Sequence, residues 1–420
     1  MTQAWGRLWW RIAWRNLWRN KRRTLLTASA LSFGFVASVL MIGLSDGVVE
    51  QMIQNGTELV TGQIQIHDQE FLPERGIHDT LGGSDGIDLA GLLAALDEVP
   101  LVSGAAPRVY GGGLVSSGDE TVGAILMGID PLREPNVSAF AENLVSGAMP
   151  GPGQILVGDQ LADDVEVDVG DEVVLVAPAA DGSLGNDLFV VSGIFSLDTG
   201  LMDGAYALLG LEDLQFLMAL PQSRIHEVAM KVDRTRDSNA VAEEVGNAVQ
   251  SMAPGLLVQP WSEFLPQLYF FTSLASASNL VIAGMIFGMA VFGVANTMLI
   301  ATYERRREFA VVRALGTARR SVGLTVVCEG ILLGAVSLAA GVMIALPLMA
   351  WIHAHPIDLS RWVGSYSMMG SSVRPLVTVE YSWDGPIFSG LALVVTGLAS
   401  ALYPAWKAVR VPPADALSSR

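Results

Sequence analysis

Two acidic and six basic side chains are crowded into residues 303–322, between two long apolar stretches. Glu304 and Glu308 stand about one helical turn apart. The basic residues are Arg305, Arg306, Arg307, Arg313, Arg319 and Arg320. Arginines at the end of an apolar span suit a positive-inside anchor, which would hold this connector on the cytoplasmic side of a membrane. The glutamates raise the further question of whether the connector binds a partner.

The connector also has the pattern of a short amphipathic helix. Phe309, Val312 and Leu315 recur at three-residue spacing and predict an apolar stripe. Gly316 is placed to cap this helix, and Thr317 to begin the next one. An anchor needs neither the apolar stripe nor the glutamates, so the pattern favours a docking surface.

The sequence lacks the motifs for ATP hydrolysis and for ester hydrolysis. A phosphate-binding loop needs a Gly-Lys pair, and none of Lys21, Lys231 and Lys407 follows a glycine. The Gly-x-Ser-x-Gly pattern of residues 82–86 lacks the strand-to-helix context of a nucleophile elbow. It predicts a loop, with Asp88 as the cap of a following helix.

Two features of the apolar part could carry chemistry. His353 and His355 could hold a metal ion, but two histidines are a weak signal, and a loop at the membrane boundary is favoured. Glu329 is a carboxylate within an apolar span, about two turns from Arg319 and Arg320, and so a candidate intramembrane polar site. It is either neutralised near the interface by hydrogen bonds or a proton, or used in helix packing or gating. We predict no catalytic residue and no metal ligand.

The first 23 residues predict an amphipathic helix that lies in the membrane interface. Arginines recur every four residues on one face, at Arg7, Arg11, Arg15 and Arg19. Broadly opposite them lie Trp9, Trp10, Ala13 and Leu17, with Trp14 at the flank and Trp18 among the arginines. The residues predicted to contact membrane lipids are Trp9, Trp10, Arg11, Trp14 and Arg15.

Composition and hydropathy indicate a membrane protein. The chain is 51% hydrophobic and 16% charged, with a mean hydropathy of +0.43. The predicted membrane helices are residues 24–45, 271–302, 322–353 and 385–405, each long enough to cross a bilayer of about 30 Å. The first is interpreted as an uncleaved anchor, because its apolar run exceeds that of a usual signal peptide.

The positive-inside rule orients these spans. Sixteen of the 25 Lys and Arg residues fall in residues 1–23, 303–321 and 406–420, which are therefore predicted to be cytoplasmic, both termini included. Residues 46–270 form the predicted extracytoplasmic domain, and residues 354–384 an extracytoplasmic loop.

The predicted extracytoplasmic domain is strongly acidic. It holds seven Lys or Arg against 35 Asp or Glu, a formal charge of −28, which disfavours nucleic acid as a partner. The lone cysteine, Cys328, lies in a span, so no intrachain disulfide stabilises this domain.

Helical and strand patterns mix in this domain without a regular βαβ repeat, which predicts an α+β fold. The expected helices are residues 48–60, 89–99, 211–220 and 239–250. The expected strand regions are residues 62–71, 121–131, 154–178 and 188–200. The glycines and prolines between these segments are interpreted as loops.

The whole chain resembles the FtsX-like permeases, which include lipoprotein-releasing permeases and the membrane part of the macrolide exporter MacB. The connector motif "NTMLIATYERRREFAVVRALGTARRSV" (Asn296–Val322) is the most specific part of the resemblance. The closing "YPAWKAVRVPPADALSSR", the opening "WRIAWRNLWRNKRRTLL" and the phrases "GIDP", "GDQLA" and "VGDEV" add to it in the family's order.

The resemblance implies the permease subunit of an ABC transporter in a bacterial inner membrane, with a MacB-like periplasmic core domain. A separate cytoplasmic ATPase would bind ATP and Mg²⁺, no cofactor would sit on this chain, and two permeases, identical or homologous, would assemble with two ATPases. The residues implied or predicted to couple to the ATPase are Glu304, Arg305, Glu308, Phe309, Val312, Arg313, Ala314, Leu315 and Gly316.

Release or export of a lipoprotein or another amphiphilic cargo is the first functional expectation, with an extracytoplasmic carrier or cargo protein as partner. A transmembrane signal transmitter that activates a cell-wall hydrolase and a MacB-like efflux permease are the alternatives. A membrane-anchored enzyme or receptor is the remaining class, and no catalytic constellation in the sequence supports it.

Overall fold

The computed structural model describes residues 2–72, 75–198, 200–250, 252, 255–358, 366–368, 371–373, 376–379 and 382–410. Two compact units divide the chain. The helical unit comprises residues 1–48, 273–357 and 376–420, and the sheet unit comprises residues 49–272 and 358–375. Each unit has its own core and its own polar network.

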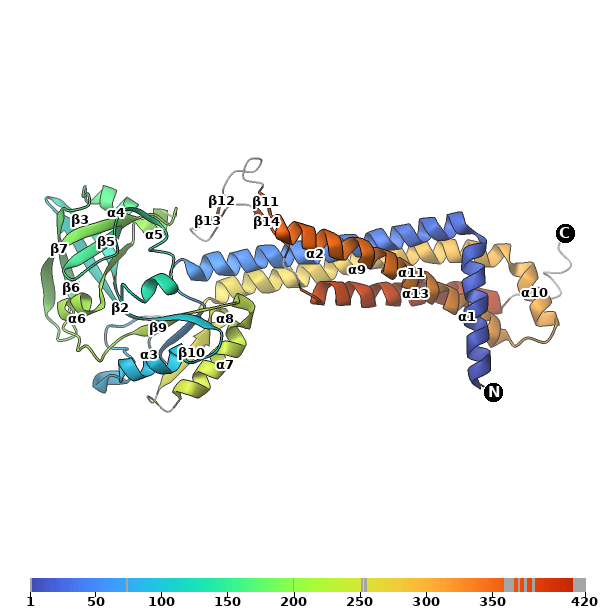
Figure 1. Cartoon of the computed structure of the whole chain (residues 1–420), viewed down its shortest axis with the longest axis horizontal. Helices are drawn as coiled ribbons and strands as arrows, with labels where there is room; N and C mark the ends of the chain where they lie inside the picture. Colours follow the sequence, from blue (N-terminus) through green and yellow to red (C-terminus); the bar gives the residue numbers. More distant parts are fainter. Residues whose placement is uncertain are drawn as a thin grey trace. The chain divides into compact units, whose positions relative to one another are not determined.

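Long apolar helices dominate the helical unit (Figure 1). Its helices are α1 (Thr2–Arg19), α2 (Lys21–Glu58), α9 (Pro266–Glu304), α10 (Arg306–Ala314), α11 (Arg319–Ala354) and α13 (Asp384–Val409). Of these, α2, α9, α11 and α13 are long and apolar enough to cross a membrane. The predicted four-span architecture is confirmed, although α2 and α9 continue beyond the predicted ends of their spans into residues of the sheet unit.

Small residues bring α11 and α13 close together. A Cβ added at Gly330 would lie 2.6 Å from the Cβ of Ala401 and 2.6 Å from the carbonyl oxygen of Gly397. Hydroxyl groups add contacts within the bundle, since Ser32 donates to the Ser337 carbonyl at 2.8 Å. Close backbone approach and interhelical hydrogen bonds replace the hydrophobic effect, which is weak between helices in lipid.

Between α11 and α13 the structure describes short strands: β11 (Ile357–Asp358), β12 (Tyr366–Met368), β13 (Ser371–Val373) and β14 (Leu376–Val377). The rest of the predicted loop of residues 354–384, and the predicted tail beyond Arg410, lie largely outside the described residues.

The sheet unit is built on one mixed sheet of ten strands, in the order β10-β1-β9-β2-β3-β8-β5-β7-β4, with β6 paired to β2 and β7. The strands are β1 (Ile64–Asp68), β2 (Val102–Ser117), β3 (Glu120–Ile129), β4 (Leu144–Gly147), β5 (Gln154–Gly158), β6 (Glu172–Pro178), β7 (Leu184–Phe195), β8 (Tyr206–Gly210), β9 (Glu227–Val232) and β10 (Leu256–Pro260). The helices are α3 (Leu89–Asp97), α4 (Asp159–Asp164), α5 (Gly200–Asp203), α6 (Leu211–Leu217), α7 (Ser238–Val249) and α8 (Trp261–Phe264). Only the β3–β8 and β5–β7 pairs are parallel, which confirms the predicted α+β class.

Most of the expected elements of the sheet unit are present. Helices α3, α6 and α7 and strands β1, β3 and β7 lie where the patterns predict them. Asp88 is the N-cap of α3 and accepts the Gly91 N–H, as predicted. The Gly-x-Ser-x-Gly segment is a short 3₁₀ turn at Gly83–Asp85 and no nucleophile elbow. The strand region of residues 154–178 also contains the short helix α4.

The loop interpretation of Gly111, Gly112 and Gly113 was wrong, because these residues lie in the middle of β2. This strand pairs with β9 along its first half, with β6 along its second half, and with β3. A Cβ at Gly113 would lie 2.7 Å from Leu126 Cδ1 and 2.9 Å from the Val176 carbonyl oxygen. Glycine is needed there for close backbone approach, not for a turn.

A buried ionic network lies inside the sheet unit. Arg108 is fully buried and pairs with Glu134 at 2.5 Å and with Glu227 at 3.2 Å. The Tyr110 hydroxyl donates to Glu227 at 2.7 Å. Burial alone would lower the pKa of Arg108, but Glu134, Tyr110 and Glu227 together raise it well above its usual value. The network therefore fixes β2, β9 and the turn at Glu134 relative to one another.

Candidate functional site

The connector between α9 and α11 forms the helix α10, which ends as the sequence predicts. Gly316 has a φ of +94°, and its N–H donates to the Arg313 carbonyl at 3.0 Å. The Thr317 N–H donates to the Val312 carbonyl at 3.3 Å, which completes a Schellman motif. The prediction that Thr317 begins the next helix was wrong: α11 has Ala318 as its N-cap, because Thr317 belongs to the motif that closes α10.

The apolar stripe expected on the connector is divided between two faces. Phe309 is only 6% exposed and joins the core of the helical unit, whereas Leu315 is 82% exposed. Residues six apart on a helix point about 120° away from each other, so Phe309 and Leu315 cannot share one surface. Phe309 holds the helix against the bundle, and Leu315 remains open to a partner.

The open face of the connector is apolar with a cationic border. We call it the connector surface; its members are Val311, Val312, Ala314, Leu315 and Gly316, all exposed. The exposed side chains of Arg306 and Arg307 lie one turn before it. A Cβ at Gly316 would meet no atom within 4 Å, so this end of the surface is uncovered. Such a patch can bind an apolar groove on a partner protein.

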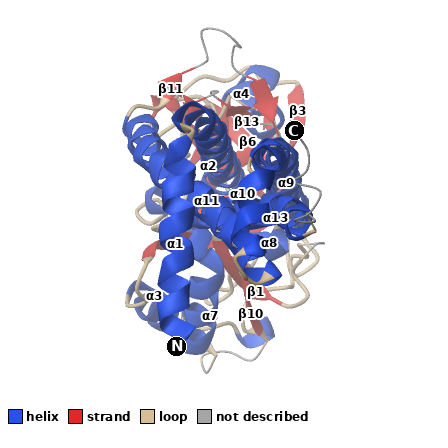
Figure 2. Ribbon diagram, turned by 90° about the vertical axis from the view of Figure 1, so that its right-hand side faces the viewer, coloured by secondary structure: helices blue, strands red, loops and turns tan. Residues whose placement is uncertain are grey.

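Helix α1 crosses the ends of the long helices, as both views show (Figures 1 and 2). Ala13 and Leu17 are buried in the helical unit. Trp10, Trp14 and Trp18 are exposed and recur every four residues. Arg11 and Arg15 are exposed as well, which is compatible with the predicted interfacial role; the side chain of Trp9 lies outside the described residues.

Two ion pairs tie the N-terminal part of the chain to the connector. Arg19 Nη1 lies 2.8 Å from Glu308 Oε1, and Arg23 Nη1 lies 2.8 Å from Glu304 Oε2. The side chains of Glu304 and Glu308 remain 55% and 48% exposed. Exposed pairs of this kind contribute about 0–1 kcal/mol each, so they can exchange partners easily.

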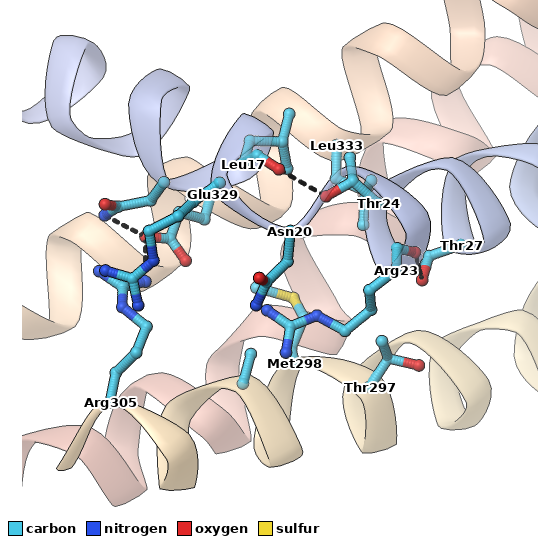
Figure 3. Close-up of a pocket in the computed structure, with 13 residues that line it drawn as sticks. Leu17, Asn20, Arg23, Thr24, Thr27, Thr297, Met298, Arg305, Glu329 and Leu333 are labelled. Atoms are coloured by element: carbon cyan, nitrogen blue, oxygen red, sulfur yellow. Dashed lines mark hydrogen bonds and ion pairs between the residues drawn. The ribbon is translucent and has the colours of Figure 1, made fainter.

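Glu329 joins the same network from α11 (Figure 3). Its Oε1 accepts from Asn16 Nδ2 at 2.7 Å and from Arg305 Nη1 at 2.8 Å. Arg305 also contacts Glu308 at 3.3 Å and lies over the Phe309 ring at 5.0 Å. Of the two interpretations left open by the sequence, the structure shows a carboxylate satisfied by hydrogen bonds, whereas a role in gating stays a prediction.

Asn16 is a site residue that sequence reasoning missed. Its position within an arginine-rich helix gives no signal, because the contact joins residues 313 positions apart. Asn16, Arg23, Thr24, Thr297 and Glu329 are among the residues that line a polar cavity of about 50 Å³ beside this network (Figure 3). A cavity of this size and polarity suits a few water molecules that would keep the network hydrated.

The pairing holds Glu308 in its charged form. Burial alone would raise its pKa, but hydrogen bonds from Arg19 and Arg305 lower the pKa below its usual value. At neutral pH its carboxylate is therefore paired both with Arg19 of α1 and with Arg305, the N-cap residue of α10. Arg313 contacts a different element, donating to the Val409 carbonyl at 3.4 Å.

A second hollow, of about 310 Å³, lies in the helical unit where α2, α9 and α13 meet near residues 42–46, 276–280 and 384–388. Its lining combines apolar Ile42, Leu280 and Phe388 with the carboxylates Asp46 and Asp384. A hollow with an apolar wall and polar groups is suited to an amphiphile.

No group of three metal-binding side chains is found among the described residues. His353 lies within α11, and its Nδ1 is 2.9 Å from the Val379 carbonyl oxygen. His355 is the C-cap of α11. The interpretation of both histidines as a boundary loop was therefore wrong for His353, which lies in the last turn of α11, whereas His355 ends the helix.

Four spans, a mixed extracytoplasmic sheet domain and an amphipathic connector define an ABC transporter permease. The family described as MacB-like periplasmic core domain matches residues 24–248, and the FtsX-like permease C-terminal family matches residues 280–413. The first match spans more than half of the chain, which therefore belongs to this permease family. The chain is a bacterial inner-membrane protein, and its sheet unit is a periplasmic domain.

Individual relatives are similar along almost the whole chain. The lipoprotein-releasing system transmembrane protein LolC of Xylella fastidiosa is 27% identical over 401 residues, which cover 92% of this chain and 94% of LolC. LolE of Haemophilus influenzae is 24% identical over 77% of this chain and 79% of its own length. The macrolide export ATP-binding/permease protein MacB of Sodalis glossinidius is 24% identical, and the match covers 95% of this chain and 58% of MacB.

Proposed function

We propose that this permease couples ATP hydrolysis by a separate cytoplasmic ATPase subunit to movement of its periplasmic domain. The observation that carries the proposal is the connector surface, an open apolar patch with a cationic border on a helix fixed to the bundle by Phe309. A docked ATPase would bind ATP and Mg²⁺ and push on α10. Because α2 and α9 contribute residues to both units, a shift of their connector ends would be passed to the periplasmic domain.

The coupling residues divide into two roles in this proposal. Val312, Ala314, Leu315 and Gly316 touch the ATPase directly, because they are exposed. Arg305 and Phe309 position α10 against the bundle, because their side chains face it. Glu304, Glu308 and Arg313 are placed at the edge of the connector surface, where exchange of their present partners would let them contact the ATPase.

The proposed assembly has two permeases and two ATPases, and both termini of this chain are cytoplasmic. The proposed cargo is a lipoprotein or another amphiphile taken from the outer leaflet. Similarity to lipoprotein-releasing relatives and the amphiphilic hollow near Asp46 and Asp384 support it. A periplasmic carrier would receive the released cargo.

The docking role is tested with Leu315→Asp, and Leu132→Asp is its matched control. Leu132 is 87% exposed in the sheet unit, so both variants place one carboxylate at an open leucine. We expect Leu315→Asp to abolish co-purification of the ATPase and stimulation of its hydrolysis, and Leu132→Asp to leave both unchanged. If both variants bind the ATPase like the wild type, the docking assignment is wrong.

The cargo is tested by reconstituting the permease and its ATPase in proteoliposomes with a radiolabelled triacylated lipoprotein. ATP-dependent appearance of lipoprotein on an added soluble acceptor supports lipoprotein release. ATP-dependent activation of a cell-wall hydrolase, or extrusion of a macrolide without lipoprotein release, would replace it with the signalling or the efflux function.

A further inference from the structure

The N-terminal part of the chain, which comprises α1 and the start of α2, carries two kinds of cation. Some are paired with the connector, and others are not. Arg19 and Arg23 pair with Glu308 and Glu304. Arg11, Arg15, Lys21 and Arg22 are exposed, and none makes an ion pair with a described residue. No Asp or Glu precedes Asp46 in the chain, so no acidic residue of α1 or of the first half of α2 balances these charges.

The exposed tryptophans add a second signal to the same segment. Trp10, Trp14 and Trp18 form a row, and the rings of Trp14 and Trp18 meet edge to face at 5.8 Å. Indole rings prefer the depth of the lipid headgroups, and clustered cations beside them attract anionic lipids. Tryptophans and unpaired cations thus fit one occupant, the surface of a membrane with anionic headgroups.

We infer that anionic lipid headgroups compete with Glu304 and Glu308 for Arg23 and Arg19, and so regulate how the connector receives the ATPase. This inference rests on the proposed docking function of the connector. The pairs to be exchanged are half-exposed, and a headgroup phosphate offers the guanidinium a bond of the same kind. Because the exchange replaces one surface ion pair by another, a modest change in lipid charge can shift it.

The direction of the effect follows from the charges. When Arg19 of α1 and Arg23 of α2 hold the connector, they neutralise the carboxylates of Glu308 and Glu304. When lipid phosphates hold Arg19 and Arg23, Glu304 loses its arginine and Glu308 keeps only Arg305, so both carboxylates gain capacity for contact with the ATPase. Anionic lipid therefore strengthens docking, and Asn16 and Arg305 keep Glu329 paired in both states because their bonds do not involve these two arginines.

The test measures ATPase affinity for the full-length permease in nanodiscs of phosphatidylcholine alone or mixed with phosphatidylglycerol. We expect about fivefold tighter binding in the anionic discs. Arg19→Gln/Arg23→Gln is expected to bind equally in both, with the tighter affinity. Arg11→Gln/Arg15→Gln removes two headgroup-attracting cations without touching the ion pairs, so it is expected to keep the wild-type affinity in phosphatidylcholine discs and to need more phosphatidylglycerol for the tighter binding. Inorganic phosphate added to phosphatidylcholine discs is expected to have no effect.

A second readout needs no ATPase. Spin labels at Arg15→Cys and Val312→Cys, in a Cys328→Ser background, report the separation of α1 and α10. We expect a longer or broader distance distribution in anionic discs. An identical distribution in both lipids, or lipid-dependent affinity that survives in Arg19→Gln/Arg23→Gln, overturns the inference. Absence of ATPase binding in every disc would overturn the proposed function as well, whereas lipid-independent binding would leave the proposed function standing.

Discussion

The molecule uses arginine–glutamate networks in two places, and their burial differs. In the sheet unit, Arg108, Glu134 and Glu227 have no exposed surface. At the connector, Arg19 and Glu308 are each about half exposed. The same residue types therefore carry different energies: removing a partner from a buried pair costs about 3–5 kcal/mol, and an exposed pair contributes about 0–1 kcal/mol.

The difference in burial fits the role that each network has in the proposed mechanism. A domain that passes on movement needs strands that keep their positions, and a buried network provides that. A connector that meets a partner needs contacts that can exchange, and half-exposed ion pairs provide that. Substitutions in either network test one side of this contrast.

The largest expected effect comes from Arg108→Met, which leaves Glu134 and Glu227 buried without their cation. We expect a loss of about 3–5 kcal/mol in the stability of the sheet unit. Hydrogen exchange of the β2 and β9 amides in the full-length protein measures it. Arg133→Met is the control, because Arg133 pairs with Asp97 at the surface and its loss is expected to cost less than about 1 kcal/mol. If both variants lost the same amount of stability, the buried and the exposed ion pairs would not differ in energy.

Acid should weaken the sheet unit before it weakens the connector. His226 is buried, and its Nδ1 accepts the Tyr110 N–H, so burial lowers the pKa of this histidine. The unfolded chain binds the proton first, near the ordinary pKa of about 6.5. Stability is therefore complete above that pH and declines as the pH falls through the lowered pKa.

Glu308 is the acid-sensitive group at the connector, as His226 is in the sheet unit. Its pKa is lowered, so the stability from its ion pairs is fully present above the ordinary glutamate pKa of about 4.3. It is lost only as the pH falls through the lowered value. Hydrogen exchange between pH 7 and pH 5 should thus show β9 losing protection while α10 does not, and His226→Gln should abolish the loss. Parallel losses in both elements would contradict this assignment.

A substitution at the C-terminal cap of α10 is expected to change stability by an intermediate amount. Gly316→Ala places a Cβ on a residue with φ +94° and should destabilise the end of α10 by about 1 kcal/mol. Gly246→Ala is the matched control in the middle of α7, where the same change should stabilise by a similar amount. Amide exchange of Thr317 and of the α7 amides reports both. A neutral Gly316→Ala would mean that this residue leaves its left-handed conformation at no cost.

The smallest effect on stability is expected from Arg19→Gln, at less than about 1 kcal/mol, and it should vanish at high salt. Arg22→Gln, which removes an exposed cation without a described ion pair, is the control and should change nothing. Thermal unfolding of both variants at low and high salt separates them. A salt-independent loss in Arg19→Gln would show that this pair is as shielded as the Arg108 network.

Several features of the fold and site could be predicted because their causes are local. The four spans follow from runs of apolar residues, and the Gly316 cap from a glycine after an amphipathic turn. Other features could not be predicted. Gly111–Gly113 have the composition of a loop, yet they lie within β2, and at Gly113 an added Cβ would collide with the neighbouring strands β3 and β6. The tryptophan row at Trp10, Trp14 and Trp18 was visible in the spacing and was overlooked.

The sequence by itself determined the class of protein, the spans, the acidic periplasmic domain and the place of the connector, since hydropathy, charge and motifs are properties of contiguous residues. Only the tertiary structure decided what the connector's side chains contact. In the folded structure Phe309 is buried and Leu315 is exposed, while Glu304 and Glu308 form ion pairs with Arg23 and Arg19. These contacts depend on how α1, α2, α9 and α10 pack, because partners nearly 300 residues apart in the chain become neighbours only in the folded bundle.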